Sequence, residues 1–383
     1  MRVAVDAMGG DHAPAALVAG AVRAARELQA GVLLCGDRHQ LETALRDHDV
    51  AGLDIEICHA SGQIEMEDSP TEALRRPETS LRAAVAAVKD GKAQACVYAG
   101  NTGAGMVLGR HLLGCVVGVE RPAIAVQIPR AKGYTVLLDA GANVDTKPVH
   151  LAQFAVMGDA YVRAMQGQQA PKVALLSNGS EESKGDLRVR RALPLVSQLP
   201  LNIVGAIEAN ELCHDKADVV VCDGFAGNIA LKSLEGFGKF LGGNLSETFR
   251  SGLRGRLAYL LVRRSILKIR RAVDPGETGG ALLLGLQGTL VKAHGSSDAA
   301  AVKNAIVLAQ QLAEREVPLQ IAQSMERFIE MSGGDPAEVP ETRTRKLWQS
   351  LRNRLRGSSR NEDPDPPEAA TAEALVRKED DNG

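Results

Sequence analysis

A polar, glycine-rich stretch stands directly after an apolar run near the middle of the chain. The stretch is Cys222-Asp223-Gly224-Phe225-Ala226-Gly227-Asn228, and the run before it is Ala217–Val221. Because that run is short, β-branched and continuous, it indicates a buried parallel strand. A helical pattern begins near Ala226. A glycine-rich turn between a strand and a helix exposes backbone N–H groups, which bind an anion or a developing oxyanion.

The same device occurs three more times. Polar, glycine-rich turns follow apolar runs at Met8–Asp11, Gly100–Gly105 and Gly141–Asn143. In an open α/β sheet, ligands bind at the carboxyl ends of the strands. We therefore expect these turns to build one site at the carboxyl edge of a single sheet.

The elements that position these turns alternate between strands and helices almost to residue 315. This alternation predicts an α/β fold with a mostly parallel sheet covered on both faces. We expect a hairpin of two strands around the turn Arg130–Gly133, and helices over Val149–Met165, Gly279–Ala293 and Asp298–Glu316. The domain prediction is a catalytic α/β domain over 1–335, followed by a charged, largely disordered tail over 336–383.

Composition excludes several classes of protein. The formal net charge is −2 and the aromatic content is 3%, which argues against binding to nucleic acid. Six scattered cysteines without a C-x-x-C motif indicate reduced thiols in a cytoplasmic protein. We see no signal peptide and no apolar run of about 20 residues that would span a bilayer.

One segment is basic and amphipathic. From Glu247 to Asp274 no acidic residue intervenes, and basic residues alternate with apolar ones. This pattern predicts a helical hairpin that contacts an anionic membrane surface, with a helix pair covering the sheet or a dimer interface as the alternative. The residues expected at the membrane are Leu257, Leu260, Leu261, Val262, Arg263, Arg264 and Ile266, within a segment that we bound at 240–273.

The motifs together resemble a known family. Asp6–Asp11, Ala99–Ala104, Leu138–Asp145, Glu181–Gly185, Val221–Asn228 and Lys292–Gly295 occur in the order found in the bacterial acyl-acyl-carrier-protein:phosphate acyltransferase (PlsX) family. The resemblance spans residues 1 to about 335. Tyr98 departs from it, because the family usually has a small residue there, and Gly105-Met106 replaces a more usual Leu or Met pairing.

The resemblance implies a fold and a reaction. The fold is a three-layer α/β/α homodimer similar to isocitrate and isopropylmalate dehydrogenases and to phosphotransacetylase. The enzyme would move a long-chain acyl group from acyl carrier protein to inorganic phosphate. Because carrier proteins are strongly acidic, the basic face over 250–271 could dock one instead of lipid. The acyl phosphate would then supply a glycerol-3-phosphate acyltransferase in phospholipid synthesis at the membrane, to which the protein would bind peripherally.

This reaction suggests roles for particular residues. Phosphate is itself the nucleophile, so the site must mainly position two reactants and stabilise an oxyanion. Lys184 and Asn228 are the first candidates to contact phosphate or oxyanion, with a surface ion pair and helix capping as their alternatives. Asn101 and Thr102 are further donors, with helix capping as the same alternative, and either His294 or His12 could protonate the thiolate.

The remaining predicted positions fall into two sets. We expect Asp6, Asp139 and Asp223 to orient donors rather than to hold a metal, and we predict neither a metal nor a cofactor. The phosphate- and substrate-binding positions are Gly10, Asp11, His12, Gly100, Thr102, Gly103, Asn143, Gly224 and Gly227.

Two other functions stay open at this point. One is a nicotinamide-dependent dehydrogenase on the same fold, although no G-x-G-x-x-G motif with an acidic partner follows a strand. The other is a non-catalytic membrane scaffold that docks acyl carrier protein.

Overall fold

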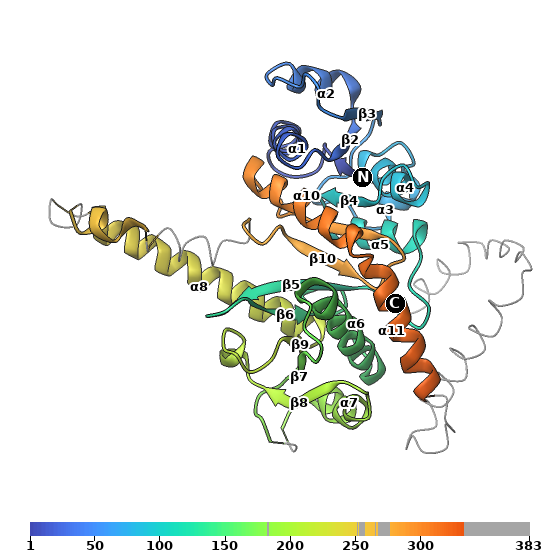
Figure 1. Ribbon diagram of the computed structural model, residues 1–383, viewed down its shortest axis with the longest axis vertical. Coiled ribbons are helices and arrows are strands. Elements are labelled where there is room, and N and C mark those ends of the chain that lie inside the picture. The colour runs from blue at the N-terminus through green and yellow to red at the C-terminus, as the bar shows by residue number, and fades with distance from the viewer. Residues whose placement is uncertain (182–183, 251, 253–256, 265, 267–275, 333–383) are drawn as a thin grey trace, which may run out of the picture. The chain divides into compact units, whose positions relative to one another are not determined.

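The described part of the chain forms one mixed sheet of eleven strands with helices on both faces (Figure 1). The computed structural model describes residues 1–332 except 182–183, 251, 253–256, 265 and 267–275. The tail predicted over 336–383 lies outside the described residues, and so does part of the basic segment. The predicted α/β class with a mostly parallel sheet is confirmed.

The strands are β1 (Arg2–Asp6), β2 (Gly31–Gly36), β3 (Ile55–His59), β4 (Ala95–Tyr98), β5 (Ala123–Pro129), β6 (Tyr134–Leu138), β7 (Lys172–Leu176), β8 (Asn202–Ile207), β9 (Val219–Val221), β10 (Ala281–Leu284) and β11 (Thr289–Lys292). The helices are α1 (Ala15–Leu28), α2 (Arg38–Leu45), α3 (Glu72–Arg75), α4 (Ser80–Lys89), α5 (Thr102–Leu112), α6 (Pro148–Gln166), α7 (Leu187–Ser197), α8 (Gly224–Arg250), α10 (Ala299–Glu314) and α11 (Val317–Ser332), with a 3₁₀ turn at Ala209–Glu211. Residues 257–264 are also helical.

The sheet consists of two parallel groups that run in opposite directions. Its order is β3-β2-β1-β4-β11-β10-β5-β6-β9-β7-β8. The first group is β3, β2, β1, β4 and β11, and the second is β6, β9, β7 and β8. Between them, β10 and β5 pair antiparallel to each other and to their outer neighbours.

One row of paired residues crosses the whole sheet. It consists of Ile57, Leu34, Val5, Val97, Val291, Leu282, Ala125, Leu138, Val221, Leu175 and Ala206. The strands of both parallel groups end at this row or within two residues after it. The carboxyl ends of the two groups therefore meet at one line, although the strands approach it from opposite directions.

Helices α4, α5 and α8 cover one face of the sheet on either side of this row. α4 and α5 pack on the first group through a cluster that includes Leu81, Leu108 and Leu290. α8 packs on the second group through Ala226 and Ala230, and its Leu231 contacts the clusters of both groups. α8 thus begins at the carboxyl end of β9 in the second group, and its next turns reach the cluster that covers the first group. The opposite face is covered by α1, α6, α10 and α11.

The helix predicted over Gly279–Ala293 is wrong, because this segment forms strands β10 and β11. Gly279, Gly280 and Gly285 have φ values of 83°, 104° and 88°, which do not continue a right-handed helix. The leucine run of β10 is buried by pairing between β11 and β5. The predicted hairpin around Arg130–Gly133 is confirmed as the β5–β6 pair.

Candidate functional site

Three glycine-rich loops meet at the carboxyl ends of β1, β4 and β11. A Cβ atom on Gly9 would lie 3.0 Å from the backbone nitrogen of Gly100. Gly10 has a φ of 101°, and a Cβ on it would lie 3.0 Å from the carbonyl oxygen of Gly295. The backbone N–H of Asp11 donates to that same carbonyl oxygen over 2.9 Å. The close approach of these backbones requires glycine, and it brings the predicted residues Gly10, Asp11 and Gly100 together with the loop that carries His294.

Asp6 is the buried carboxylate beneath these loops. Only 2% of the residue is exposed, and its Oδ1 accepts a long hydrogen bond of 3.4 Å from the backbone N–H of Met8. Burial raises the pKa of Asp6 to about 6, while Ser80 and the backbone amides of Met8 and Gly9 act in the opposite direction. The carboxylate thus lies directly against the Met8–Gly10 turn, where a Cβ on Gly9 would come 2.7 Å from its Oδ2.

Asn101 caps α5, and both ends of its side-chain amide are engaged. Its Oδ1 accepts from the backbone N–H of Ala104 over 3.0 Å. Its Nδ2 donates to the carbonyl oxygens of Met66 and Asp68 over 3.1 and 2.8 Å. This geometry is that of the capping alternative, and it positions the backbone of Thr102 and Gly103.

A second group of loops meets at the carboxyl ends of β6 and β9. Asp139 is fully buried and accepts five hydrogen bonds: from the backbone amides of Ile124, Gly141, Ala142 and Asn143, and from Asn143 Nδ2. Asn143 Nδ2 also donates to the carbonyl oxygen of Pro122 over 2.9 Å. The predicted substrate residue Asn143 thus uses its side chain to fix this turn.

The start of α8 packs against that turn. Asp223 Oδ1 accepts from the backbone N–H groups of Phe225 and Ala226, both over 3.0 Å. Gly224 donates its N–H to the carbonyl oxygen of Asn143 over 2.8 Å. A Cβ on Gly227 would lie 1.9 Å from the carbonyl oxygen of Asp139, so only glycine fits at that position.

Asn228 lies beside the loop that follows β6, whereas Lys184 lies on the loop between β7 and α7. A Cβ on Gly141 would lie 3.6 Å from Asn228 Oδ1, which places Asn228 beside the second group of loops. Lys184 is exposed on the loop between β7 and α7, where its backbone N–H donates to the carbonyl oxygen of Glu181 over 2.9 Å. From the start of α7, Arg188 Nη2 lies 3.4 Å from Asp223 Oδ2.

Two lysines that we did not predict as site residues, Lys292 and Lys232, lie close enough for their charges to interact. Lys292 ends β11, and Lys232 lies one helical turn after Asn228 on α8. Burial lowers the pKa of Lys292, and the charge of Lys232 lowers it further; Glu235 and Asp11 oppose this change. Lys232 Nζ pairs with Glu235 Oε2 over 2.9 Å, and Lys292 Nζ donates to the carbonyl oxygen of Ala293 over 3.1 Å.

His294 lies beside this lysine pair. Its Nδ1 accepts from the backbone N–H of Ser296 over 3.2 Å, so the neutral ring carries its proton on Nε2. Burial lowers the pKa of His294, followed by the charges of Lys292 and Lys232. His12, by contrast, is exposed at the entry to α1.

The sequence contained a signal for both lysines. Lys292 follows the apolar run Leu290-Val291, as a residue at the end of a buried strand does, but the predicted helix over this segment concealed it. Lys232 is four residues after Asn228, the spacing that places two side chains on one helix face.

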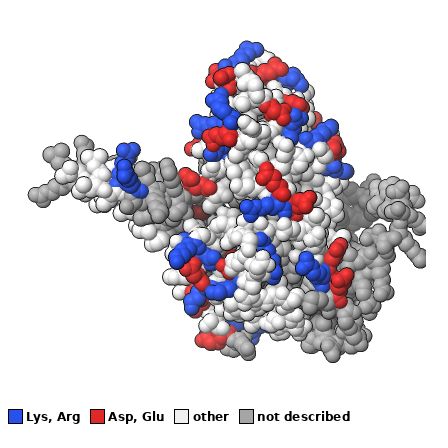
Figure 2. All heavy atoms as spheres, viewed as in Figure 1, with Lys and Arg blue, Asp and Glu red and all other residues white. Residues whose placement is uncertain are grey.

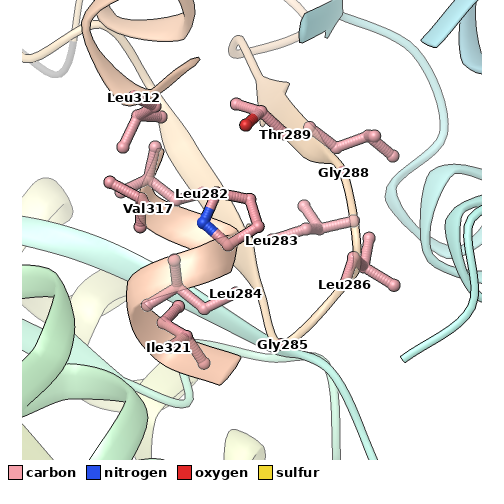
Figure 3. Close-up of a pocket in the computed structure, with 12 residues that line it drawn as sticks. Leu282, Leu283, Leu284, Gly285, Leu286, Gly288, Thr289, Leu312, Val317 and Ile321 are labelled. Carbon is pink, nitrogen blue, oxygen red and sulfur yellow. The ribbon is translucent and has the colours of Figure 1, made fainter. Parts of the chain in front are cut away.

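A pocket lined almost entirely by apolar residues lies at the other end of the β10–β11 hairpin (Figure 3). Leu282 and Leu284 of β10 line it together with Val317 and Ile321 of α11. It has no charged lining residue and no polar side chain except Thr289. An anion needs donors, so we place the candidate site at the polar loops instead.

Known proteins resemble this chain along most of its length. The model of a family described as fatty acid synthesis protein matches residues 1–320. A phosphate acyltransferase of Geobacter sulfurreducens is 44% identical over 327 residues, which are 85% of this chain and 94% of the relative. The chain belongs to this family. Another member, the phosphate acyltransferase of Pelobacter propionicus, is 46% identical over 341 residues, or 88% of this chain and 99% of the relative.

Solved structures share the fold at low sequence identity. A phosphotransacetylase from Streptococcus pyogenes has a TM-score of 0.53 and 18% sequence identity. The superposed region covers 85% of this chain and 94% of the phosphotransacetylase chain. A branched-chain phosphotransacylase from Enterococcus faecalis has a TM-score of 0.52 and 15% sequence identity, and the superposed region covers 82% of this chain and 99% of the phosphotransacylase chain. At this identity the likeness concerns the fold alone.

Proposed function

We propose that this protein transfers a long-chain acyl group from the thioester of acyl carrier protein to inorganic phosphate, releasing acyl phosphate for phospholipid synthesis. Membership of the family supports the reaction class, because relatives 44% and 46% identical are named phosphate acyltransferase. The observation that carries the proposal is the meeting of the carboxyl ends of both strand groups at one row, with Lys292 at the end of β11 and Lys232 on α8 close enough for their charges to interact.

Phosphate binds, on this proposal, between Lys292 and Lys232. Phosphate is a mixture of monoanion and dianion at neutral pH, and two ammonium groups offset this charge. Burial lowers the pKa of Lys292 most and the charge of Lys232 adds to this, and an anion between the two amines would offset both effects. The glycines at 9, 10 and 100 leave room for the anion to approach the backbone.

The transfer then needs little covalent help from side chains. A phosphate oxygen attacks the thioester carbonyl carbon, the carbonyl oxygen becomes an oxyanion, and the carbon–sulfur bond breaks as the thiolate leaves. Backbone N–H groups near Thr102 and Gly103 and the amide of Asn228 are the proposed oxyanion donors. His294 is the proposed donor to the thiolate, from Nε2. Lys184, on the loop between β7 and α7, stays a predicted contact for phosphate or the oxyanion.

The reaction is tested by its stoichiometry. Purified protein is given acyl carrier protein charged with palmitate, and the free carrier thiol and the acyl phosphate, trapped as hydroxamate, are measured together. We expect both to appear in equal amounts and only when phosphate is present. Thiol release that does not depend on phosphate would indicate a thioesterase and contradict the proposal. The same assay with acyl-coenzyme A shows whether the carrier protein is needed.

Peripheral membrane binding is the second part of the proposal. None of the described helices is long and apolar enough to cross a membrane. The outer half of α8 nevertheless exposes Phe237 and Phe240 by 60% and 63%, and the helical segment 257–264 exposes Leu260 and Leu261 by 66% and 82%. Together with Arg263 and Arg264, these residues suit shallow insertion into an anionic surface. Figure 2 shows this arm as mostly uncharged with a basic group near its end.

A vesicle assay tests the membrane contact. Replacing Leu260 and Leu261 by Glu should abolish sedimentation with vesicles containing phosphatidylglycerol, and the binding of the unchanged protein should weaken as salt rises. Leu187→Glu, at an apolar side chain on α7 that is 55% exposed, is the matched control and should bind normally. Equal binding of all three proteins would show that the arm is not the anchor.

Three further relations complete the proposal. The protein acts as a cytoplasmic homodimer, and its product supplies a glycerol-3-phosphate acyltransferase at the same membrane. The fold is related to that of isocitrate and isopropylmalate dehydrogenases.

A further inference from the structure

Two cysteines lie directly opposite each other on neighbouring parallel strands. Cys35 of β2 pairs in register with Cys58 of β3. Strands are about 4.8 Å apart, and disulfides join Cα atoms about 4.4–6.8 Å apart. Both side chains are on the sheet face that α4 covers, since both belong to the cluster around Leu81. The backbone therefore already holds the two Cα atoms within the range that a disulfide joins.

The two thiols differ in access and in charge. Cys35 is fully buried, whereas Cys58 is on the edge strand and half-buried. The positive charges of Lys92 and Arg38 act on Cys58 and favour its thiolate. The adjacent Cys35 thiol, followed by these charges, lowers the pKa of Cys58 to about 6, and its neighbour Cys58 together with burial raises the pKa of Cys35. The Cys35 thiol itself donates to the carbonyl oxygen of Leu33 over 3.8 Å. Cys58 is thus the thiolate and Cys35 the thiol beside it.

We propose that Cys58 and Cys35 form a peroxide-reactive pair that closes to a reversible disulfide. The Cys58 thiolate attacks one oxygen of hydrogen peroxide, the O–O bond breaks, and hydroxide leaves and is protonated to water, which gives Cys58 sulfenic acid. The sulfur of Cys35 then attacks the Cys58 sulfur, the S–O bond breaks, and water leaves with the proton of Cys35. Two thiols and one peroxide give one disulfide and two waters.

The other cysteines lack this combination. Cys213 is exposed overall, but partial desolvation raises the pKa of its thiol, whereas Cys96 is fully buried and burial raises its pKa well above the usual range. Cys213 therefore serves as the matched control. A thiolate at Cys58 should react with iodoacetamide roughly tenfold faster than Cys213 at neutral pH.

Peptide mapping tests the pair on the full-length protein. Trypsin places Cys35 in residues 27–38 and Cys58 in residues 47–75, each without a second cysteine. After brief exposure to hydrogen peroxide, these two peptides should be linked, and dithiothreitol should separate them. Cys58→Ala should remove the link, Cys213→Ala should leave it unchanged, and Cys35→Ala should let Cys58 proceed to sulfinic acid.

Two results would overturn the proposal. One is oxidation of Cys213 before Cys58. The other is sulfinic acid at Cys58 in the unchanged protein as fast as in Cys35→Ala. If Cys35→Ala does not fold, the linked peptide in the unchanged protein and its absence in Cys58→Ala still decide the question. The readout is covalent, so its failure leaves the proposed acyl transfer untouched.

Discussion

Gly105→Ala should destabilise the protein because of one neighbour, Tyr98. A Cβ on Gly105 would lie 2.2 Å from Tyr98 Cζ and 2.3 Å from its Oη. The ring of Tyr98 is fully buried at the end of β4, in the cluster under α5. Gly105 and Tyr98 are the two departures from the family pattern that we noted, and the structure couples them: the absent side chain makes room for the ring.

The size of the effect follows from the overlap. Ordinary carbon contacts are about 3.5–4.0 Å, so the ring or the helix must move by more than about 1 Å. Overpacking of this kind costs about 1–3 kcal/mol. Within a helix, alanine otherwise gains about 1 kcal/mol over glycine. Gly238→Ala on α8, where a Cβ meets nothing within 4 Å, is the matched control and should be neutral or stabilising.

A double-mutant cycle measures the coupling by urea denaturation. Gly105→Ala should cost about 1–3 kcal/mol in the native background and be close to neutral after Tyr98→Ala, which gives a coupling of at least about 1 kcal/mol. Equal costs of Gly105→Ala in both backgrounds would refute the steric explanation. So would a stabilising Gly105→Ala in the protein that keeps Tyr98.

Three further changes test the supports of the loops. Tyr98→Phe should be neutral or stabilising by up to about 1 kcal/mol, since the buried hydroxyl has no hydrogen-bond partner among the described residues; a loss in melting temperature would contradict this. The raised pKa of Asp6 means that its folded form binds more protons than its unfolded form between about pH 4 and 6, so stability falls by about 3 kcal/mol as pH rises through that window. Asp6→Asn should flatten this slope in urea titrations at several pH values, and a slope that persists would show that another group causes it. Asp139→Ala leaves four backbone amides without their acceptor, so we expect a loss of about 3 kcal/mol or more and faster amide exchange at Ala142 and Asn143; unchanged exchange there would exclude the orienting role.

Local pattern predicted most strands because burial on both faces requires continuous β-branched or apolar runs. The hairpin of β5 and β6 was also readable, since a short basic turn with Gly133 joins two such runs. β10 was missed because a leucine run such as Leu282–Leu284 suits a buried helix as well as a strand. Only the pairing of this segment between β11 and β5 decides that it is a strand and not a helix.

The direction of a strand cannot be read from its residues. We therefore expected all the polar turns at one carboxyl edge, whereas the two parallel groups run in opposite directions and meet at a shared row. The engagement of Asn101 and Asn143 in capping and turn contacts depends on carbonyl groups 21 to 36 residues away in sequence. Such partners are set by the fold and not by local spacing.

The most direct test of the central claim is the phosphate dependence of Lys292→Met. The lysine pair is proposed to hold the attacking phosphate, so this variant should raise the KM for phosphate by at least roughly tenfold while the KM for the acyl carrier substrate changes little. Lys89→Met, at an exposed lysine on α4, should behave like the unchanged enzyme. If Lys292→Met kept a normal KM for phosphate and a normal kcat, the phosphate site would not be at the end of β11.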